Sequence, residues 1–259
     1  MAFVKIKALI LDIDGILWRY ENPIGYLERI FNNIIDKGLD YCFATNNSSK
    51  PVTEYVKKFN KHNIPVNEGQ VHTSGQVTAK ILEERFPEGG NVFVIGMEGL
   101  LKSLNQSGFK NSENNPLAVI VGLDKNVTYE KLLTATLLIR QGVPFIGTNG
   151  DKTFPTPEGL VPGAGSILAA LIASTNKEPE VIGKPHPTIF LQALKYLEVQ
   201  PKNVLVVGDR LETDIAGGQS VGCKTALVLS GVSSLEMAEK WYPTPDIIAE
   251  NLSFVIERL

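Results

Sequence analysis

Short runs of apolar and β-branched residues, each bounded by turn residues, recur along the chain and predict β-strands. Between most of these runs the apolar residues follow the helical period, most clearly at 187–196 and, after Pro51, as far as residue 59. Strands that alternate with helices are typical of a parallel sheet covered on both faces, so we predict an α/β fold. The predicted strands are 8–12, 41–45, 92–95, 117–121, 144–147, 204–207, 225–229 and 246–248.

The middle of the chain carries enough elements for a compact unit of its own. Three of the predicted strands and at least three helical patterns fall between residues 76 and 179, and Gly-rich and Pro-rich turns flank this stretch. A chain of 259 residues is long enough for two domains. We therefore expect a core formed by residues 1–75 and 180–259, with an inserted domain at 76–179.

Composition and charge narrow the class of protein. The chain is 43% hydrophobic and 20% charged, which is ordinary for a folded globular protein. A formal net charge of −3 gives no broad basic field, so we expect no nucleic-acid partner. No apolar run reaches the length of a bilayer span, and Cys42 and Cys223 lie inside apolar runs, as buried thiols do. We expect a cytoplasmic protein without a membrane partner.

Two carboxylates follow the first predicted strand, at Asp12 and Asp14, and Gly15 comes next. Side chains alternate along a strand, so both acids start on the same side, and the glycine lets the chain turn. Carboxylates this close repel each other unless a cation or a shared proton intervenes. The pattern indicates metal or proton chemistry, although a capped turn with solvated charges has the same sequence.

Three further strand ends carry polar or charged residues. Thr45, Asn46 and Asn47 follow the second strand, where a hydroxyl and backbone amides suit phosphate oxygens but are also common in loops. Lys184 follows a short apolar run and could equally be a solvated surface lysine. Asp209 ends the run at 204–207, and Asp214 follows it; these two, with the other strand ends, are hard to explain as helix caps alone.

In this order the motifs resemble those of the haloacid dehalogenase-like phosphatases, and the resemblance covers essentially the whole chain. That superfamily has an apolar strand with DxDG, a strand ending in Ser or Thr, a lysine and a GDxxxxD stretch. The segments ATNNS, TNGDKTFPTPEGLVPGAGS, GKPHP and GDRLETDI look like the NagD-like subfamily. The resemblance implies a Rossmann-like parallel-sheet core with an inserted α/β cap.

The resemblance also implies a mechanism. Asp12 would be the nucleophile that forms a phospho-aspartyl intermediate, and Asp14 the general acid and base. Mg²⁺ would be held by Asp12, the backbone carbonyl of Asp14 and Asp209, with Asp214 supporting the site from outside or through a water. The substrate would be a small phosphate monoester.

Phosphate-binding groups follow by the same resemblance. Lys184 and Thr45 would neutralise the phosphoryl oxygens together with amides near Gly15 and Asn46, and Asn47 would line the pocket. The cap's specificity loop would fall at 148–155. Its side chains Asn149, Asp151 and Phe154 could contact the rest of the substrate, although an aspartate can simply cap a turn and an aromatic ring can belong to the core.

Alternatives remain open on the sequence. A phosphomutase uses the same scaffold, and a non-catalytic phospho-aspartate sensor also gathers aspartates, a threonine and a lysine at sheet ends. The second aspartate, Asp14, and the insertion favour an enzyme over a sensor. Nucleotides, phosphoglycolate, sugar phosphates and pyridoxal phosphate are all candidate substrates. Members of the resembled subfamily often associate through their caps, so a homodimer is expected as well.

Overall fold

The computed structural model describes residues 5–259, so the first four residues of the expected core lie outside it. The described chain forms two compact units. The core unit consists of the chain up to Thr45, of Tyr55–His72 and of Lys184–Leu259, and the inserted unit consists of Asn46–Glu54 and Thr73–Gly183. The limits of 76 and 179 fall inside the longer segment of the inserted unit and stay a prediction.

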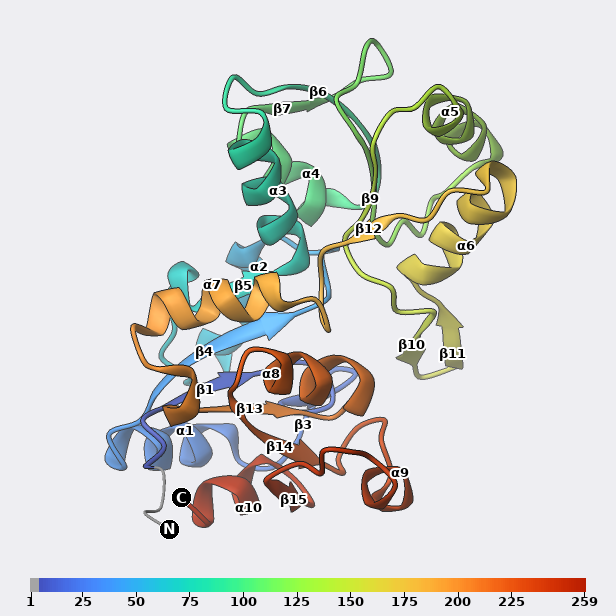
Figure 1. Cartoon of the computed structure of the whole chain (residues 1–259). Helices are drawn as coiled ribbons and strands as arrows, with labels where there is room; N and C mark the ends of the chain where they lie inside the picture. Colours follow the sequence, from blue (N-terminus) through green and yellow to red (C-terminus); the bar gives the residue numbers. More distant parts are fainter. Residues whose placement is uncertain (1–4) are drawn as a thin grey trace. The chain divides into compact units, whose positions relative to one another are not determined.

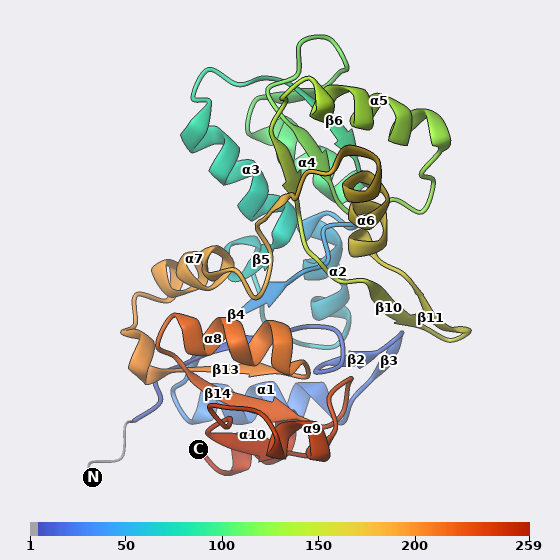
Figure 2. The same ribbon diagram turned by 45° about the vertical axis from the view of Figure 1, so that its right-hand side comes forward.

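The core unit is built on a six-stranded sheet with the strand order β15-β14-β13-β1-β4-β5. Helices α7 and α8 cover one face of this sheet, and α1 and α10 cover the other (Figures 1 and 2). Its strands are β1 (Ala8–Leu11), β4 (Asp40–Thr45), β5 (Val71–Thr73), β13 (Val204–Gly208), β14 (Lys224–Val228) and β15 (Ile247–Ala249). The helices are α1 (Leu27–Asp36), α7 (Pro187–Leu197), α8 (Ala216–Ser220), α9 (Leu235–Glu239), α10 (Leu252–Glu257) and, from Tyr55 onward, α2 (Val52–Lys61), whose first three residues belong to the inserted unit.

The central strands are hydrophobic throughout because helices bury both of their faces. Every residue of β1 and of β13 is buried. These two strands pair in parallel, with Leu11 opposite Val207, and the chain leaves them in opposite directions along the sheet. Ligands of open α/β sheets bind at such a switch point, outside the carboxyl ends of the strands. The sheet order therefore points to the residues that follow β1 and β13.

The inserted unit has a five-stranded parallel sheet of its own, in the order β12-β9-β8-β6-β7. Helices α3 and α4 lie on one side of it and α5 and α6 on the other (Figure 1). Its strands are β6 (Gly90–Ile95), β7 (Phe109–Asn111), β8 (Val119–Val121), β9 (Phe145–Gly147) and β12 (Glu180–Val181). The helices are α3 (Ser74–Arg85), α4 (Glu98–Gln106), α5 (Tyr129–Arg140) and α6 (Ala164–Thr175).

The α/β fold predicted from the sequence is confirmed, and each predicted strand matches one in the structure within a few residues. The sequence analysis did not identify the shortest elements. Besides β5 and β7, these are two hairpins, β2 (Trp18–Arg19) with β3 (Asn22–Pro23) and β10 (Thr153–Thr156) with β11 (Gly159–Pro162). Within residues 5–259, no helix combines the length and apolar character needed to cross a bilayer.

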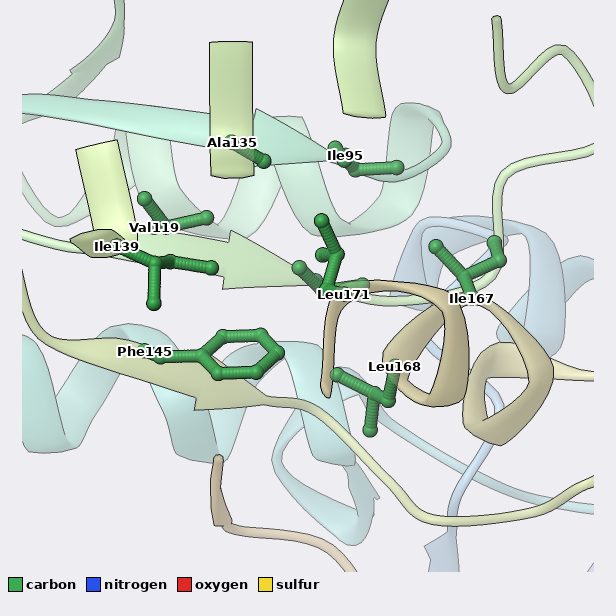
Figure 3. Packing of buried hydrophobic residues seen from close by; sticks show 9 residues of the cluster. Ile95, Val119, Ala135, Ile139, Phe145, Ile167, Leu168 and Leu171 are labelled. Carbon is green, nitrogen blue, oxygen red and sulfur yellow. The ribbon is translucent and has the colours of Figure 1, made fainter. Parts of the chain in front are cut away.

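A hydrophobic cluster between the sheet of the inserted unit and helices α5 and α6 holds that unit together (Figure 3). Leu171 of α6 lies at its centre and is fully buried. Side chains from three strands and both helices meet there. They are Ile95, Val119, Val121, Ala135, Ile139, Phe145, Ile167, Leu168 and Leu171.

We predict that Leu171→Ala destabilises the inserted unit by about 2–5 kcal/mol, because a fully buried leucine is replaced without filling the space it leaves. The measurement is amide hydrogen exchange of β8 and β9, which reports on this unit alone. Leu160→Ala is the control, since that side chain on β11 is 71% exposed and its loss should cost no more than about 0.5 kcal/mol. Equal effects of the two changes would contradict the assignment of Leu171 to the core.

Candidate active site

Asp12 and Lys184 form the centre of the core-unit site. Asp12 follows β1, and its backbone N–H donates to the Val207 carbonyl of β13 at 3.0 Å. The Lys184 ammonium donates to Asp12 Oδ1 at 2.7 Å, to Asp214 Oδ1 at 2.6 Å and to the Ala44 carbonyl at 2.9 Å. All three donor positions of this ammonium therefore have acceptors, and Lys184 is not the solvated surface lysine that the sequence also allowed.

Asp209 and Asp214 reach the same place from the end of β13. Asp209 is the first residue after that strand, and its Oδ2 accepts the Val232 N–H at 2.8 Å. Asp214 lies on a π-helical turn, Leu211–Ile215, and its Oδ2 accepts the Arg210 N–H at 3.1 Å. One oxygen from each of Asp12, Asp209 and Asp214 lies within 4.8 Å of the other two.

Glycines make room for these carboxylates. A Cβ on Gly208 would lie 2.0 Å from the Cβ of Asp214, and a Cβ on Gly15 would lie 2.5 Å from Asp209 Oδ2. Gly15 also has a φ of +82°, which other residues rarely adopt. Both glycines are therefore required by the close approach of the acidic side chains.

The electrostatics of this cluster are unbalanced. Burial raises the pKa of Asp12 well above its usual value, and repulsion from Asp214 and Asp209 adds to this, although Lys184 opposes it. Burial and the charge of Asp214 raise the pKa of Asp209 to about 7. For Lys184, burial alone lowers the pKa, but Asp12 and Asp214 outweigh it and raise the value. Three carboxylates with one ammonium leave a surplus of negative charge.

A divalent cation fits this donor set. The available atoms are carboxylate oxygens, which are the ligands that hard cations such as Mg²⁺ and Ca²⁺ prefer. A cation among Asp12, Asp209 and Asp214 would offset the repulsion that raises the pKa values of Asp12 and Asp209. The three aspartates form a possible metal-binding group.

The other predicted residues of the core unit lie nearby along the chain. Asp14 is exposed two residues beyond Asp12, and its backbone bridges to Trp18. Thr45 is buried at the end of β4, next to Ala44, whose carbonyl accepts from Lys184. The structure thus brings Asp12, Lys184, Asp209 and Asp214 into direct contact or close approach. The contact of Lys184 with Ala44 had no signal in the sequence.

The remaining predicted residues belong to the inserted unit. Asn46, Asn149 and Asp151 are hydrogen-bonded to one another, and Asn47 Oδ1 accepts from the N–H and hydroxyl of Ser49. Phe154 on β10 lies apart from this network.

Phe154 lines a pocket of about 490 Å³ within the inserted unit. The Lys125 ammonium is 5.5 Å from the centre of its ring, at the outer limit of a cation–π contact. The walls are otherwise largely apolar side chains from β11, from α6 and from the segment that follows β8. Phe154 is therefore a wall of a cavity and not part of the cluster around Leu171.

Comparison with known proteins identifies relatives along almost the whole chain. Residues 9–110 match the haloacid dehalogenase-like hydrolase family, and residues 181–254 match a HAD-hydrolase-like family. An acid sugar phosphatase of Staphylococcus aureus is 36% identical over 257 residues, with 98% of each chain covered. A 5'-nucleotidase, YutF of Bacillus subtilis, is 36% identical over 230 residues, covering 89% of this chain and 90% of its own.

Solved structures agree with the fold. A p-nitrophenyl phosphatase from Archaeoglobus fulgidus superimposes with a TM-score of 0.92 at 30% identity, covering 98% of this chain and 100% of its own. NagD from Escherichia coli K-12 gives 0.87 at 31% identity, covering 96% and 98%. A glycerol phosphate phosphatase from Mycobacterium tuberculosis, in complex with calcium, gives 0.87 at 32% identity, covering 95% of this chain and 74% of its own.

We predict that Lys184→Met destabilises the core unit by about 3–5 kcal/mol in EDTA, because it leaves two buried carboxylates without their partner. Urea unfolding followed by tryptophan fluorescence measures this, since both tryptophans, Trp18 and Trp241, belong to the core unit. Lys224→Met is the matched control. It removes an ion pair of the same 2.7 Å length whose side chains are about 40% exposed, and should cost only about 0–1 kcal/mol.

Added Mg²⁺ should reduce the difference in the free energy of unfolding between Lys184→Met and the wild type. A cation among the aspartates offsets the negative charge that the missing ammonium leaves uncompensated. If Lys184→Met were as stable as Lys224→Met in EDTA, the buried ion pairs of Lys184 with Asp12 and Asp214 would not contribute the predicted amount of about 3–5 kcal/mol to stability.

Proposed function

Because the chain belongs to the haloacid dehalogenase-like hydrolases, in their NagD-like subfamily, and is a phosphatase, we propose that it hydrolyses small phosphate monoesters through a phospho-aspartyl intermediate on Asp12. The observation that carries this proposal is the meeting of Asp12, Asp209, Asp214 and Lys184 at the ends of β1 and β13. A nucleophile, a cation-binding group and a fixed positive charge are what phosphoryl transfer requires.

In the first half of the reaction, a carboxylate oxygen of Asp12 attacks the phosphorus, and the bond from phosphorus to the leaving oxygen breaks. Asp14 donates a proton to that leaving oxygen, so the alcohol departs neutral. Lys184 holds Asp12 Oδ1 at 2.7 Å, which orients the carboxylate and favours its ionised form against the effect of burial. The charge of Lys184 neutralises the phosphoryl oxygens, Thr45 and the amides near Gly15 and Asn46 bind them, and Asn47 lines the pocket.

In the second half, Asp14 takes a proton from a water whose oxygen attacks the phosphorus of the aspartyl phosphate. The bond between phosphorus and the Asp12 oxygen breaks, and inorganic phosphate leaves with Asp12 restored. Asp12, Asp209 and the Asp14 carbonyl would hold Mg²⁺, with support from Asp214, and the bound ion would supply positive charge that stabilises the phosphoryl oxygens. The bound calcium of the M. tuberculosis relative supports a divalent cation here.

Sugar phosphates and nucleotides are the substrates that we propose first, since relatives at 36% identity are an acid sugar phosphatase and a 5'-nucleotidase. The inserted unit corresponds to the cap of the family, which recognises the leaving portion of the substrate. We propose that Phe154 contacts that portion; its position in a pocket of about 490 Å³ supports this. The sequence predicts the same role for Asn149 and Asp151, but we do not propose it for them, because both side chains are hydrogen-bonded to Asn46. A cytoplasmic location is consistent with two free, buried cysteines.

We predict that Asp12→Asn lowers the rate of 4-nitrophenyl phosphate hydrolysis with Mg²⁺ at least about a thousandfold, because an amide cannot replace the attacking carboxylate. Asp246→Asn is the control. That carboxylate lies at the core-unit surface, 2.7 Å from Lys224, and its change should leave the rate within about twofold. Retained turnover by Asp12→Asn would exclude the covalent mechanism.

The lifetime of the phosphorylated enzyme separates the alternatives. Breakdown within a turnover, slowed by Asp14→Asn, is expected of the hydrolase, whereas persistence for minutes would indicate a phospho-aspartate sensor. Transfer of the phosphoryl group between two positions of one sugar, without release of phosphate, would indicate a phosphomutase.

We also propose that two chains associate through the inserted unit, along α5. Tyr129, Leu133 and Leu137 are 75%, 45% and 52% exposed, and their spacing of four residues places them on one helix face. Glu130 and Arg140 lie near the two ends of this apolar stripe, and the Arg140 guanidinium also donates to the Ser174 carbonyl of α6 at 3.1 Å. In an antiparallel pair of α5 helices, a twofold axis can cross the helices at the height of residue 135. Residues equally far above and below this height then face each other, so that Leu133 faces Leu137 and Glu130 faces Arg140 of the second copy. The surface is therefore self-complementary.

We predict that Glu130→Arg and Arg140→Glu each weaken dimerisation, because each places like charges opposite one another, and that the double reversal restores it. Analytical ultracentrifugation measures the dissociation constant of each variant. Leu191→Glu is the control, since that exposed leucine lies on α7 of the core unit. A monomeric wild type, or a double reversal no better than the single changes, would refute this interface.

A further inference from the structure

Asn46, the residue that follows Thr45, is held by side chains of the inserted unit. Ser74 Oγ donates to the Asn46 carbonyl at 2.7 Å, and Asn149 Nδ2 donates to the same oxygen at 2.8 Å. The Asn46 side chain in turn donates from Nδ2 to Asp151 Oδ2 at 3.1 Å. Asn46 is only 8% exposed, so these bonds are made away from bulk water, where losing one costs most.

Asn149 has its polar atoms engaged inside the protein. Its Nδ2 also approaches Thr148 Oγ1 at 3.4 Å, and its Oδ1 accepts the Asp151 N–H at 3.1 Å. The residue is 4% exposed. A substrate group could bind this amide only by displacing an existing bond, which favours a role in holding the chain.

The residues after Asn46 are fixed in the same way. The Ser48 hydroxyl lies 3.3 Å from that of Thr148, and the Gly99 N–H donates to the Ser49 carbonyl at 3.1 Å. A Cβ on Gly99 would lie 2.4 Å from the backbone carbonyl of Lys50, so the start of α4 packs directly on this segment. The loop after Thr45 therefore takes its conformation from the inserted unit.

We infer that Ser74, Asn149 and Asp151 are positioning residues for phosphate binding and do not recognise the leaving group. The carbonyl of Asn46 and the N–H of Asn47 belong to one planar peptide and point in opposite directions. Two hydrogen bonds that fix the carbonyl oxygen therefore also fix the direction of the Asn47 N–H. The inference rests on the proposed function, in which amides of this loop bind the phosphoryl oxygens.

The test compares Ser74→Ala, Asn149→Ala and Asp151→Ala with the wild type on two monoesters with unlike leaving groups, 4-nitrophenyl phosphate and glucose 6-phosphate. Each change removes a bond that fixes Asn46. We expect the loss of a neutral hydrogen bond to Asn46 to lower kcat/KM by about threefold to tenfold. The factor should be the same for both substrates, and the Ki of orthophosphate should rise by a similar factor. Orthophosphate has no leaving group, so its Ki reports on the phosphate site alone.

Two further variants separate positioning from general damage. Ser220→Ala removes a hydroxyl-to-carbonyl bond of the same 2.7 Å length, to Gly217 on α8, away from Asn46, and should leave both kcat/KM and Ki unchanged. Asp151→Asn keeps an oxygen that can accept from Asn46 and should recover most of the loss seen in Asp151→Ala. Circular dichroism and amide hydrogen exchange of β8 and β9 confirm that the inserted unit of each variant is folded.

A loss of kcat/KM that differs more than tenfold between the two substrates, with an unchanged Ki for orthophosphate, would overturn the inference in favour of leaving-group contacts. Unchanged kinetics in all three alanine variants would overturn it as well. Both results leave the proposed function standing, because the wild type is active in them. A wild type that hydrolyses neither monoester with Mg²⁺ would overturn the proposed function and this inference together.

Discussion

The ammonium of Lys184, enclosed by two carboxylates and a backbone carbonyl, is the interaction on which the core-unit site depends. A buried ammonium is tolerated only where its charge is compensated. Here two carboxylates, those of Asp12 and Asp214, contact the single ammonium, so negative charge exceeds positive charge. With Asp209 added, the site carries a surplus of negative charge, and burial together with this charge raises the pKa values of Asp12 and Asp209. A cation bound by the three aspartates would stabilise their ionised forms, and metal binding would then favour the ionised state of the proposed nucleophile, Asp12.

The sheet order explains why these residues meet. Asp12 and Asp209 each follow a fully buried strand, and the two strands are neighbours from which the chain departs in opposite directions. No helix connection covers the carboxyl ends at such a point, so polar side chains can gather there. The glycines at 15 and 208 then permit an approach that any side chain would block. The buried strands β1 and β13 position Asp12 and Asp209, and the absence of a side chain at Gly15 and Gly208 leaves room for the carboxylates.

The sequence alone was enough to predict most strands of both sheets and the acidic strand ends, because buried parallel strands are continuous apolar runs and their ends are marked by charge. It did not reveal the hairpin of β10 and β11, where three prolines and a glycine in ten residues resemble a loop. Nor did it reveal the bonds to Asn46. Ser74 and Asn149 are 28 and 103 residues away from it, and serine and asparagine in loops carry no pattern that names a distant partner.

The junction between Thr45 and Asn46 would give the inserted unit a part in the proposed phosphate binding, in addition to its proposed contact with the leaving group. A single peptide bond separates a residue of the core unit from one whose carbonyl and side chain are bound by the inserted unit. Peptide planarity allows little independent adjustment across that bond, since only the flanking φ and ψ angles can change. Changes in the inserted unit that shift Asn46 are therefore transmitted to the loop proposed to bind phosphate. Substitutions that adapt the inserted unit to a new leaving group are constrained to leave Ser74, Asn149 and Asp151 in place, while the walls of the pocket around Phe154 are free to vary.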